Sequence, residues 1–184
     1  RWNSIVSAKL FSNTSFIYSN YDFNVGFQSD GSKINFNSNI KDLNLKQDFS
    51  YYLNSKNMVR FGFNVLHHTI SPSRIQGTDI TSNKNSRNGL ENAIYAGNTF
   101  KASDKVNIDY GLRFSSYHIL GGDRYNIYDE NGITDSIVLP AGKMGKSYYN
   151  IEPRFSMSYK LNTASNIKIG FARNVQNLHL MRNS

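Results

Sequence analysis

Residues 17–28 read IYSNYDFNVGFQ, and this stretch decides the fold. Its odd positions are Ile17, Ser19, Tyr21, Phe23, Val25 and Phe27, and its even positions are Tyr18, Asn20, Asp22, Asn24, Gly26 and Gln28. Successive side chains of a β-strand point to opposite faces. The stretch therefore predicts a strand with one apolar and one polar face.

The same alternation recurs along the chain in segments of roughly eight to fourteen residues. Eight strands are expected, at about 2–10, 15–28, 33–53, 59–67, 89–100, 105–118, 149–161 and 166–176. Short turns are expected at 11–14, 54–57, 101–104 and 162–165, and a reversal at Asp30-Gly31. Longer connections are expected at 71–88 and 119–146, the second with a hairpin signal at Asn131-Gly132.

The third segment changes its apolar parity part-way. Ile34, Phe36 and Ile40 occupy even positions, whereas Leu43 and Leu45 occupy odd ones. One slipped residue near 41–42 would explain the change, as a β-bulge or as a bend where the strand leaves a membrane.

Long two-faced strands with short turns at one end and longer loops at the other are typical of outer-membrane β-barrels. The predicted fold class is all-β, with antiparallel transmembrane β-barrel strands in one domain. The mean hydropathy of -0.52 and the lack of a long apolar run do not count against it, since barrel strands average a lipid face and a polar face. A soluble β-sandwich would show shorter strands and would place Phe23, Phe61, Phe114 and Phe155 in a core.

Charge and residue types exclude several functions. The formal charge of +8 is dispersed rather than clustered, so no nucleic-acid partner is expected. The chain has no Cys, and His67 and His68 should point to opposite faces of a strand. The segment 129–132 resembles a calcium loop, but its glycine comes too early, and a hairpin turn explains it better. We therefore expect no enzyme activity, catalytic residue, cofactor or metal site.

The expected lumen-facing residues are polar or charged and are the candidates for a functional surface. They are Asp22, Asn24, Arg60, Asp109, Arg113, Glu152 and Arg154. Such residues can form an inter-strand charge ladder or contact a plug or passing solute, and for any single residue the ladder is favoured.

The expected lipid-facing residues have the opposite parity. They are Ile17, Tyr21, Phe23, Val25, Val59, Phe61, Phe63, Val106, Ile108, Leu112, Phe114, Ile151, Phe155, Met157, Ile167, Ile169 and Phe171. On this assignment Phe114→Arg should impair folding into membranes, because an arginine on the lipid face is costly. Arg113→Gln should be tolerated.

Four stretches carry a family resemblance: 91–96 (ENAIYA), 110–115 (YGLRFS), 150–156 (NIEPRFS) and 172–179 (ARNVQNLH). In this order they resemble the barrel of TonB-dependent outer-membrane receptors, most closely the Bacteroidetes-type branch. The resemblance covers the whole chain and is strongest from Glu91 to Leu180.

The resemblance implies a barrel of about twenty-two strands closed by an N-terminal plug, located in the outer membrane. It implies import of a bulky nutrient of the glycan, peptide, siderophore or cobalamin class, driven through TonB. The implied partners are outer-membrane lipid, the plug, the remaining barrel strands, TonB through the plug, and as a candidate a surface lipoprotein.

The chain lacks a secretory signal, a plug and a strand-like end, so these parts are expected to lie outside it. The alternative is a complete eight-stranded barrel with a structural or adhesion role, which strand 1 paired with strand 8 would support.

Overall fold

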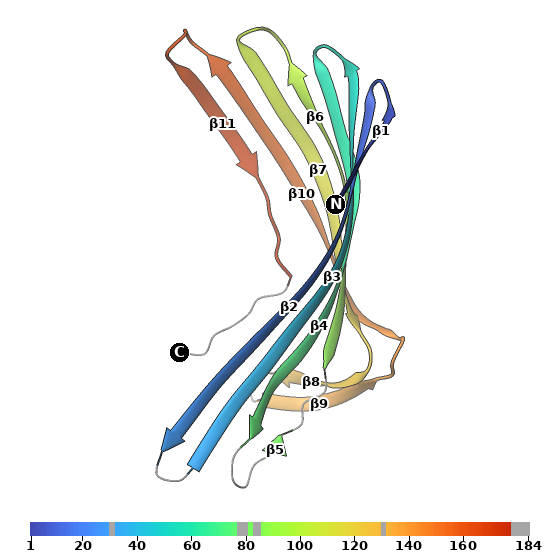
Figure 1. Ribbon diagram of the computed structural model, residues 1–184, viewed down its shortest axis with the longest axis vertical. Coiled ribbons are helices and arrows are strands. Elements are labelled where there is room, and N and C mark those ends of the chain that lie inside the picture. Colours follow the sequence, from blue (N-terminus) through green and yellow to red (C-terminus); the bar gives the residue numbers. More distant parts are fainter. Residues whose placement is uncertain (30–31, 77–80, 83–85, 130–131, 178–184) are drawn as a thin grey trace.

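Figure 1 shows a computed structural model of the chain, in which long strands form one curved antiparallel sheet. The structure describes residues 1–29, 32–76, 81–82, 86–129 and 132–177, with side chains for 1–26, 37–71, 86–122 and 136–177. The strands are β1 (Trp2–Ser7), β2 (Leu10–Ser29), β3 (Ser32–Asn54), β4 (Asn57–Gln76), β5 (Thr81–Ser82), β6 (Arg87–Lys101), β7 (Val106–Leu120), β8 (Asp123–Asp129), β9 (Gly132–Leu139), β10 (Met144–Lys160) and β11 (Asn166–Ala172).

The order across the main sheet is β1-β2-β3-β4-β6-β7-β10-β11, with β5 beside β4. Each neighbour along this path is antiparallel, and all eight expected strands are present. β8 and β9 form a separate two-stranded hairpin inside the second long connection, as the sequence predicts. The described residues include no helix that is long and apolar enough to cross a membrane.

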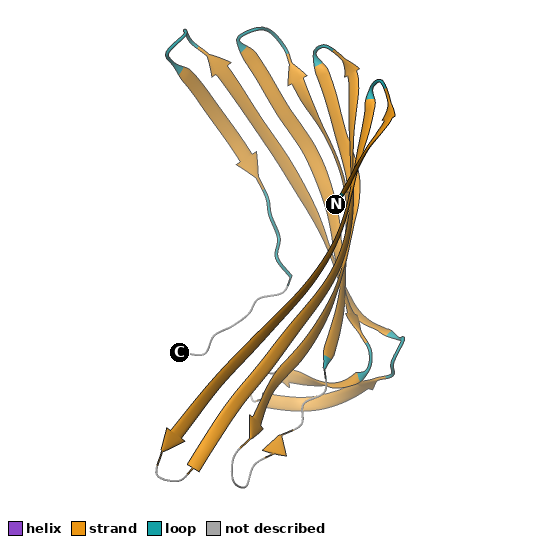
Figure 2. Ribbon diagram, in the orientation of Figure 1, coloured by secondary structure: helices purple, strands orange, loops and turns teal. Residues whose placement is uncertain are grey.

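Four short turns gather at one end of the sheet (Figure 2), and each is closed by a serine or asparagine side chain. The Asn54 Oδ1 accepts hydrogen bonds from the backbone N–H groups of Lys56 and Asn57, both at 2.9 Å. Ser103 and Asn162 accept in the same way from Lys105 and Ala164. These turns confirm the short turns that the sequence predicts at 54–57, 101–104 and 162–165. The Lys101 ammonium bonds the exposed Asp104 and lowers the pKa of that carboxyl.

The first short turn lies earlier than predicted. It falls at 8–9, where the Ser7 hydroxyl accepts from the N–H groups of Lys9 and Leu10 at 3.4 and 3.2 Å. The expected turn at 11–14 is wrong, because these residues pair with β1 on one side and with β3 on the other.

The first long connection starts later than predicted, since β4 runs on to Gln76 and pairs there with β3 and β5. The reversal expected at Asp30-Gly31 and the Asn131 position of the second hairpin signal lie outside the described residues. Gly132 opens β9.

No bulge occurs at 41–42. β2 and β3 pair without a register shift from Leu10↔Tyr51 to Ser29↔Ser32. Between β3 and β4 the register shifts at two other places, between Asn37 and Asn39 and between Tyr52 and Asn54. The polarity of β3 therefore changes face while its backbone alternation continues unbroken past 41–42, and the predicted bulge is wrong.

The sheet has two chemically different faces. Directly paired residues of neighbouring strands share a face. Phe63, Ile94, Phe114 and Ile151 pair in succession across β4, β6, β7 and β10 and define what we call the apolar face. We call the opposite face, which carries Arg113 and its pairing partners, the polar face.

Most of the residues expected to face lipid do share the apolar face. They are Val59, Phe61, Phe63, Val106, Ile108, Leu112, Phe114, Ile151, Phe155, Met157, Ile167, Ile169 and Phe171. The β2 members of the set are the exception and lie on the polar face: Ile17, Tyr21, Phe23 and Val25.

Burial is inverted relative to a soluble protein, whose large apolar side chains are mostly buried. Among the described side chains the only buried apolar one is Ala93, whereas five polar ones are buried. Phe61, Phe114 and Phe155 are each about two-fifths exposed. Phe23 lies on the opposite face from these three. No second sheet covers them, so the sandwich core expected for these phenylalanines is absent from the described part of the chain.

The main sheet has two open edges. β1 pairs only with β2 and β11 only with β10 among the described strands, and both strands are exposed throughout (Figure 1). The sealed eight-stranded cylinder of the alternative interpretation would require β1 to pair with β11. The structure has an open arc instead.

Candidate functional surface

The polar face carries a broad hollow of about 1,100 Å³ that is open to solvent. Side chains from β3, β4, β6, β7 and β10 line it. They include Lys46, Asp48, Arg60, Tyr95, Thr99, Asp109 and Arg154. Charged and polar side chains from five neighbouring strands therefore meet in this hollow.

One row of paired residues crosses seven strands on the polar face, and we call it the central polar row. Successive residues in the row pair directly with each other. From β1 to β10 the row consists of Asn3, Asn13, Asp48, Gly62, Tyr95, Arg113 and Glu152. It is a cross-strand ladder of the kind that fixes strand register.

Gly62 allows the middle of this row to form. A β-carbon at Gly62 would meet the Tyr95 hydroxyl at 2.7 Å, so the tyrosine ring lies directly over the glycine. The Tyr95 hydroxyl thereby reaches past β4 and donates a hydrogen bond to Asp48 on β3. Aromatic side chains often cover strand glycines in this way.

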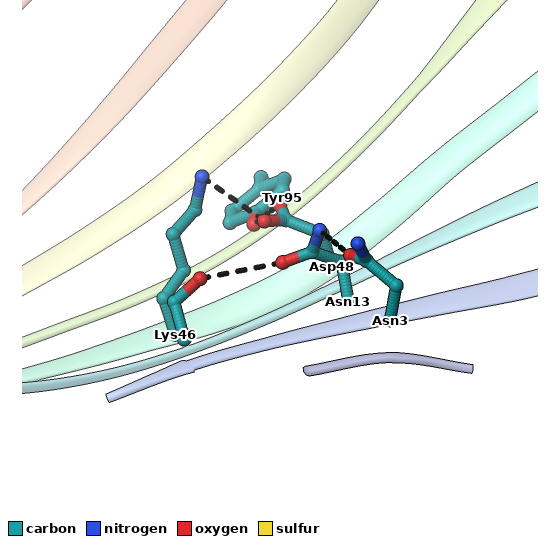
Figure 3. Close-up of polar contacts among 6 residues, drawn as sticks. Asn3, Asn13, Lys46, Asp48 and Tyr95 are labelled. Carbon is teal, nitrogen blue, oxygen red and sulfur yellow. Dashed lines mark hydrogen bonds and ion pairs between the residues drawn. The ribbon is translucent and has the colours of Figure 1, made fainter. Parts of the chain in front are cut away.

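Two cations flank the Tyr95 ring. Lys46 Nζ lies 3.2 Å from Asp48 Oδ2 and 5.9 Å from the ring centroid, and Figure 3 shows Lys46, Asp48 and Tyr95 converging. The Arg113 guanidinium carbon is also 5.9 Å from that ring centroid. Both distances lie within cation–π range. At the other end of the row, Asn13 donates to Asn3 (Figure 3).

Arg113 holds two carboxylates. Its guanidinium lies 3.7 Å from Glu91 Oε1 and 3.7 Å from Glu152 Oε1. Glu152 is only 5% exposed and accepts a 2.6 Å hydrogen bond from the hydroxyl of Ser115, which is 2% exposed. A buried carboxylate needs such partners, because an unpaired one pays its full cost of desolvation.

The structure brings together five of the seven sequence-predicted surface residues. Arg60, Asp109, Arg113, Glu152 and Arg154 lie on the polar face, and four of them fall within two neighbouring rows.

The prediction is wrong for Asp22 and Asn24, which lie on the apolar face. Asn39 donates hydrogen bonds to Asn20 and Asp22 there. In the first part of β2 the apolar face carries Leu10, Phe16 and Tyr18, which have even numbers. Beyond Tyr18 the apolar residues have odd numbers and therefore lie on the other face, so the assignment made from 17–28 does not hold for the start of the strand.

Sequence reasoning missed Asp48, Tyr95 and Ser115. Tyr95 lies in β6, where apolar and polar residues alternate less regularly than in β7, and its partner is 47 residues away. The glycine inside the otherwise regular strand β4 was the one available signal, since such a glycine often marks a close approach of another group.

The three histidines in the described part of the chain do not form a joint site. His68 lies on the polar face with Nδ1 2.8 Å from Asp42 Oδ1, and its neighbour His67 pairs with Leu43 on the other face, as expected. His118 contacts the hydroxyls of Ser116 and Ser147. Within the described ranges, no three acidic or histidine side chains cluster closely enough to hold a metal ion.

No protein-family model, curated protein or solved structure matches the chain. The resemblance to TonB-dependent receptors therefore rests on the four sequence stretches given above.

The contacts of Arg113 change the outcome expected for Arg113→Gln. We now expect this variant to lower the free energy of unfolding by about 1–2 kcal/mol, because buried Glu152 would keep only Ser115 as a partner. Denaturant unfolding in lipid or detergent measures the change. In a double-mutant cycle, Arg113→Gln and Glu152→Gln should be non-additive, and additive effects would show that the two side chains are not coupled.

Proposed function

We propose that this chain forms part of the wall of an outer-membrane β-barrel, in a TonB-dependent receptor that imports a bulky nutrient. The barrel comprises about twenty-two strands, of which the main sheet supplies one arc. The nutrient belongs to the glycan, peptide, siderophore or cobalamin class. The polar face lines the interior, and the apolar face contacts lipid.

The observation that carries the proposal is the extent of the apolar band. Starting from the short turns, the apolar face stays apolar from Val106 to Phe114 in β7 and from Tyr159 to Tyr149 in β10. It stays mainly apolar from Leu10 to Tyr18 in β2 and from Leu53 to Leu43 in β3, where the polar residues Ser12, Thr14 and Gln47 hydrogen-bond one another. Each stretch is about nine to eleven residues long, which is the length with which a tilted strand crosses a bilayer.

Beyond that band the polarity of the sheet reverses. On the apolar face, β2 continues with Asn20, Asp22 and Asn24, and β3 continues with Lys41 and Asn39. β2 and β3 have 20 and 23 residues, about twice what a bilayer requires. Strands that leave the membrane and enter water would need this polar outer surface. Because β2 and β3 pair without a register shift, the change of polarity along them does not require a bulge.

The inverted burial supports the same assignment. Ile94, Leu112 and Ile151 are each more than half exposed on adjoining strands. Monomeric soluble proteins rarely expose a continuous apolar surface of this kind. In a bilayer the same surface is solvated by lipid chains.

The two open edges support an arc within a larger barrel. Unpaired strand edges invite further pairing, and closing the cylinder with additional strands removes them. The ordered motifs at 110–115 and 150–156 connect this arc to the TonB-dependent family rather than to another type of barrel.

Fractionation and uptake of the full-length protein in its own cells test the proposal. We expect the protein in the outer-membrane fraction, and we expect its deletion to abolish growth on at least one bulky nutrient. Loss of TonB should produce the same growth defect. Recovery of the protein in a soluble fraction would contradict the barrel, and unchanged uptake of every tested nutrient class would contradict the transport role.

A further inference from the structure

Two arginines of the polar face lie on either side of a glycine pair. Arg60 on β4 pairs with Gly97 on β6, Gly97 pairs with Gly111 on β7, and Gly111 pairs with Arg154 on β10. The four residues therefore form one row, next to the central polar row. With neighbouring strands about 4.8 Å apart, the two arginine backbones are separated by roughly 14 Å.

Both side chains lean over the glycines. A β-carbon on Gly111 would lie 3.6 Å from the Cγ of Arg154, so the arginine stem passes above that residue. Arg60 Nη2 donates to the Thr99 hydroxyl on β6 at 3.4 Å, which places its guanidinium over the strand of Gly97. The absence of side chains at both glycines leaves the space between the guanidinium groups open.

These arginines differ from the other cations near the centre of this face. Lys46 is paired with Asp48, and Arg113 lies between two glutamates. Neither Arg60 nor Arg154 forms an ion pair with any carboxylate in the part of the chain that the structure describes.

The nearest acidic group is Asp109, one row away. Its Oδ1 accepts a 2.6 Å hydrogen bond from Thr99, so it is joined to Arg60 through that hydroxyl. Arg60, Arg154 and Asp109 together leave a net charge of about +1 around the glycine pair. The donors that remain free there are guanidinium N–H groups, which suit the oxygens of a carboxylate, sulfate or phosphate.

The site opens into the large hollow. Arg60, Gly97, Gly111 and Arg154 all line it, together with Tyr95. A solute in this hollow could therefore present an acidic group to both arginines without displacing a side chain of the described sheet.

We propose that Arg60 and Arg154 bind an anionic group of the imported solute across the floor formed by Gly97 and Gly111. The inference rests on the proposed function and narrows it, because it assigns the solute to the acidic members of those nutrient classes. Arg60 and Arg154 act as the specificity-determining residues, and the central polar row beside them maintains the strand register.

Calorimetric titration of the purified full-length protein tests the inference, with inorganic sulfate and citrate as probes at low ionic strength, where screening is weakest. We expect both probes to bind. Arg60→Gln and Arg154→Gln should each weaken binding about tenfold or more, since each removes a charge-assisted contact. Arg173→Gln, which removes one arginine just beyond β11, is the matched control and should leave the affinity unchanged.

Two outcomes would overturn the inference. Equal weakening by all three variants would mean that only net charge matters. Absence of sulfate and citrate binding would also overturn it. If Arg60→Gln then lowered stability when no anion is added, a carboxylate from elsewhere in the protein would occupy the site. Binding to the purified protein does not depend on transport, so the failure of this inference and the failure of the transport proposal give different results.

Discussion

Leu112→Arg is expected to destabilise the protein in a bilayer by about 2–4 kcal/mol, the cost of an arginine on the lipid face of a barrel near the membrane midplane. Leu112 lies inside the apolar band, which runs from Val106 to Phe114 in β7, and is 51% exposed. Phe114 is the last residue of that band, so Phe114→Arg should cost less. The arginine would replace an apolar side chain that lipid can solvate with a charge that lipid cannot. Reversible unfolding from lipid vesicles measures the difference from the natural protein.

Ser156→Arg is the matched control, because Ser156 is exposed on the polar face of the adjacent strand β10. It should change the free energy of unfolding by no more than about 1 kcal/mol. Equal damage from both substitutions, or greater damage from Ser156→Arg, would mean that the two faces are assigned the wrong way round.

Gly62→Ala is expected to lower the free energy of unfolding by about 2–3 kcal/mol. A β-carbon there would collide with the backbone carbonyl oxygen of Gln47 and would press on the Tyr95 hydroxyl at 2.7 Å. The backbone cannot yield as a side chain can, so the change should shift β3 away from β4 and break the bond from Tyr95 to Asp48. Denaturant unfolding measures the loss of stability.

Gly170→Ala provides the comparison within the same sheet. A β-carbon at Gly170 would meet Phe155 O at 3.5 Å and Ser156 Cβ at 3.6 Å, which are ordinary contacts. This variant should be neutral or slightly stabilising, since alanine restricts the unfolded chain. If Gly62→Ala were equally harmless, Tyr95 could not lie where the structure places it.

The sequence predicts the strands best where alternation is regular and the ends carry turn formers. β7 and β10 follow from their alternation alone, and the turns near 54–57 and 162–165 follow from Asn54 and Asn162. The first turn was misplaced because the polar residues at 12–14 look like turn formers. In the structure they are strand residues that pair on both sides.

The face assignment fails in β2 for a physical reason. Alternation fixes which residues share a face, but it does not say which face is which once the surroundings change along a strand. The segment 17–28 alternates clearly, yet its residues Tyr21, Phe23 and Val25 lie on the face opposite to Phe16 and Tyr18. Only the pairing with β3 and β4 reveals the reversal.

The candidate surface is predictable in its charges but not in its contacts. Arg113 and Glu152 stand out in the sequence because they are charged residues at the polar positions of two clearly alternating segments. The contact between Tyr95 and Asp48 depends on the register of three strands and on a glycine between them. No local pattern contains that information.

Accessibility scanning along β7 tests the central claim most directly, and these 184 residues contain no cysteine that would compete with an introduced label. Spin labels introduced one at a time from 106 to 115 in the full-length protein, reconstituted in a bilayer, would be exposed to oxygen and to a water-soluble nickel chelate. We expect strict alternation, with high oxygen and low nickel accessibility at Val106, Ile108, Tyr110, Leu112 and Phe114 and lower oxygen accessibility at the positions between them. High nickel accessibility at these five positions would contradict it.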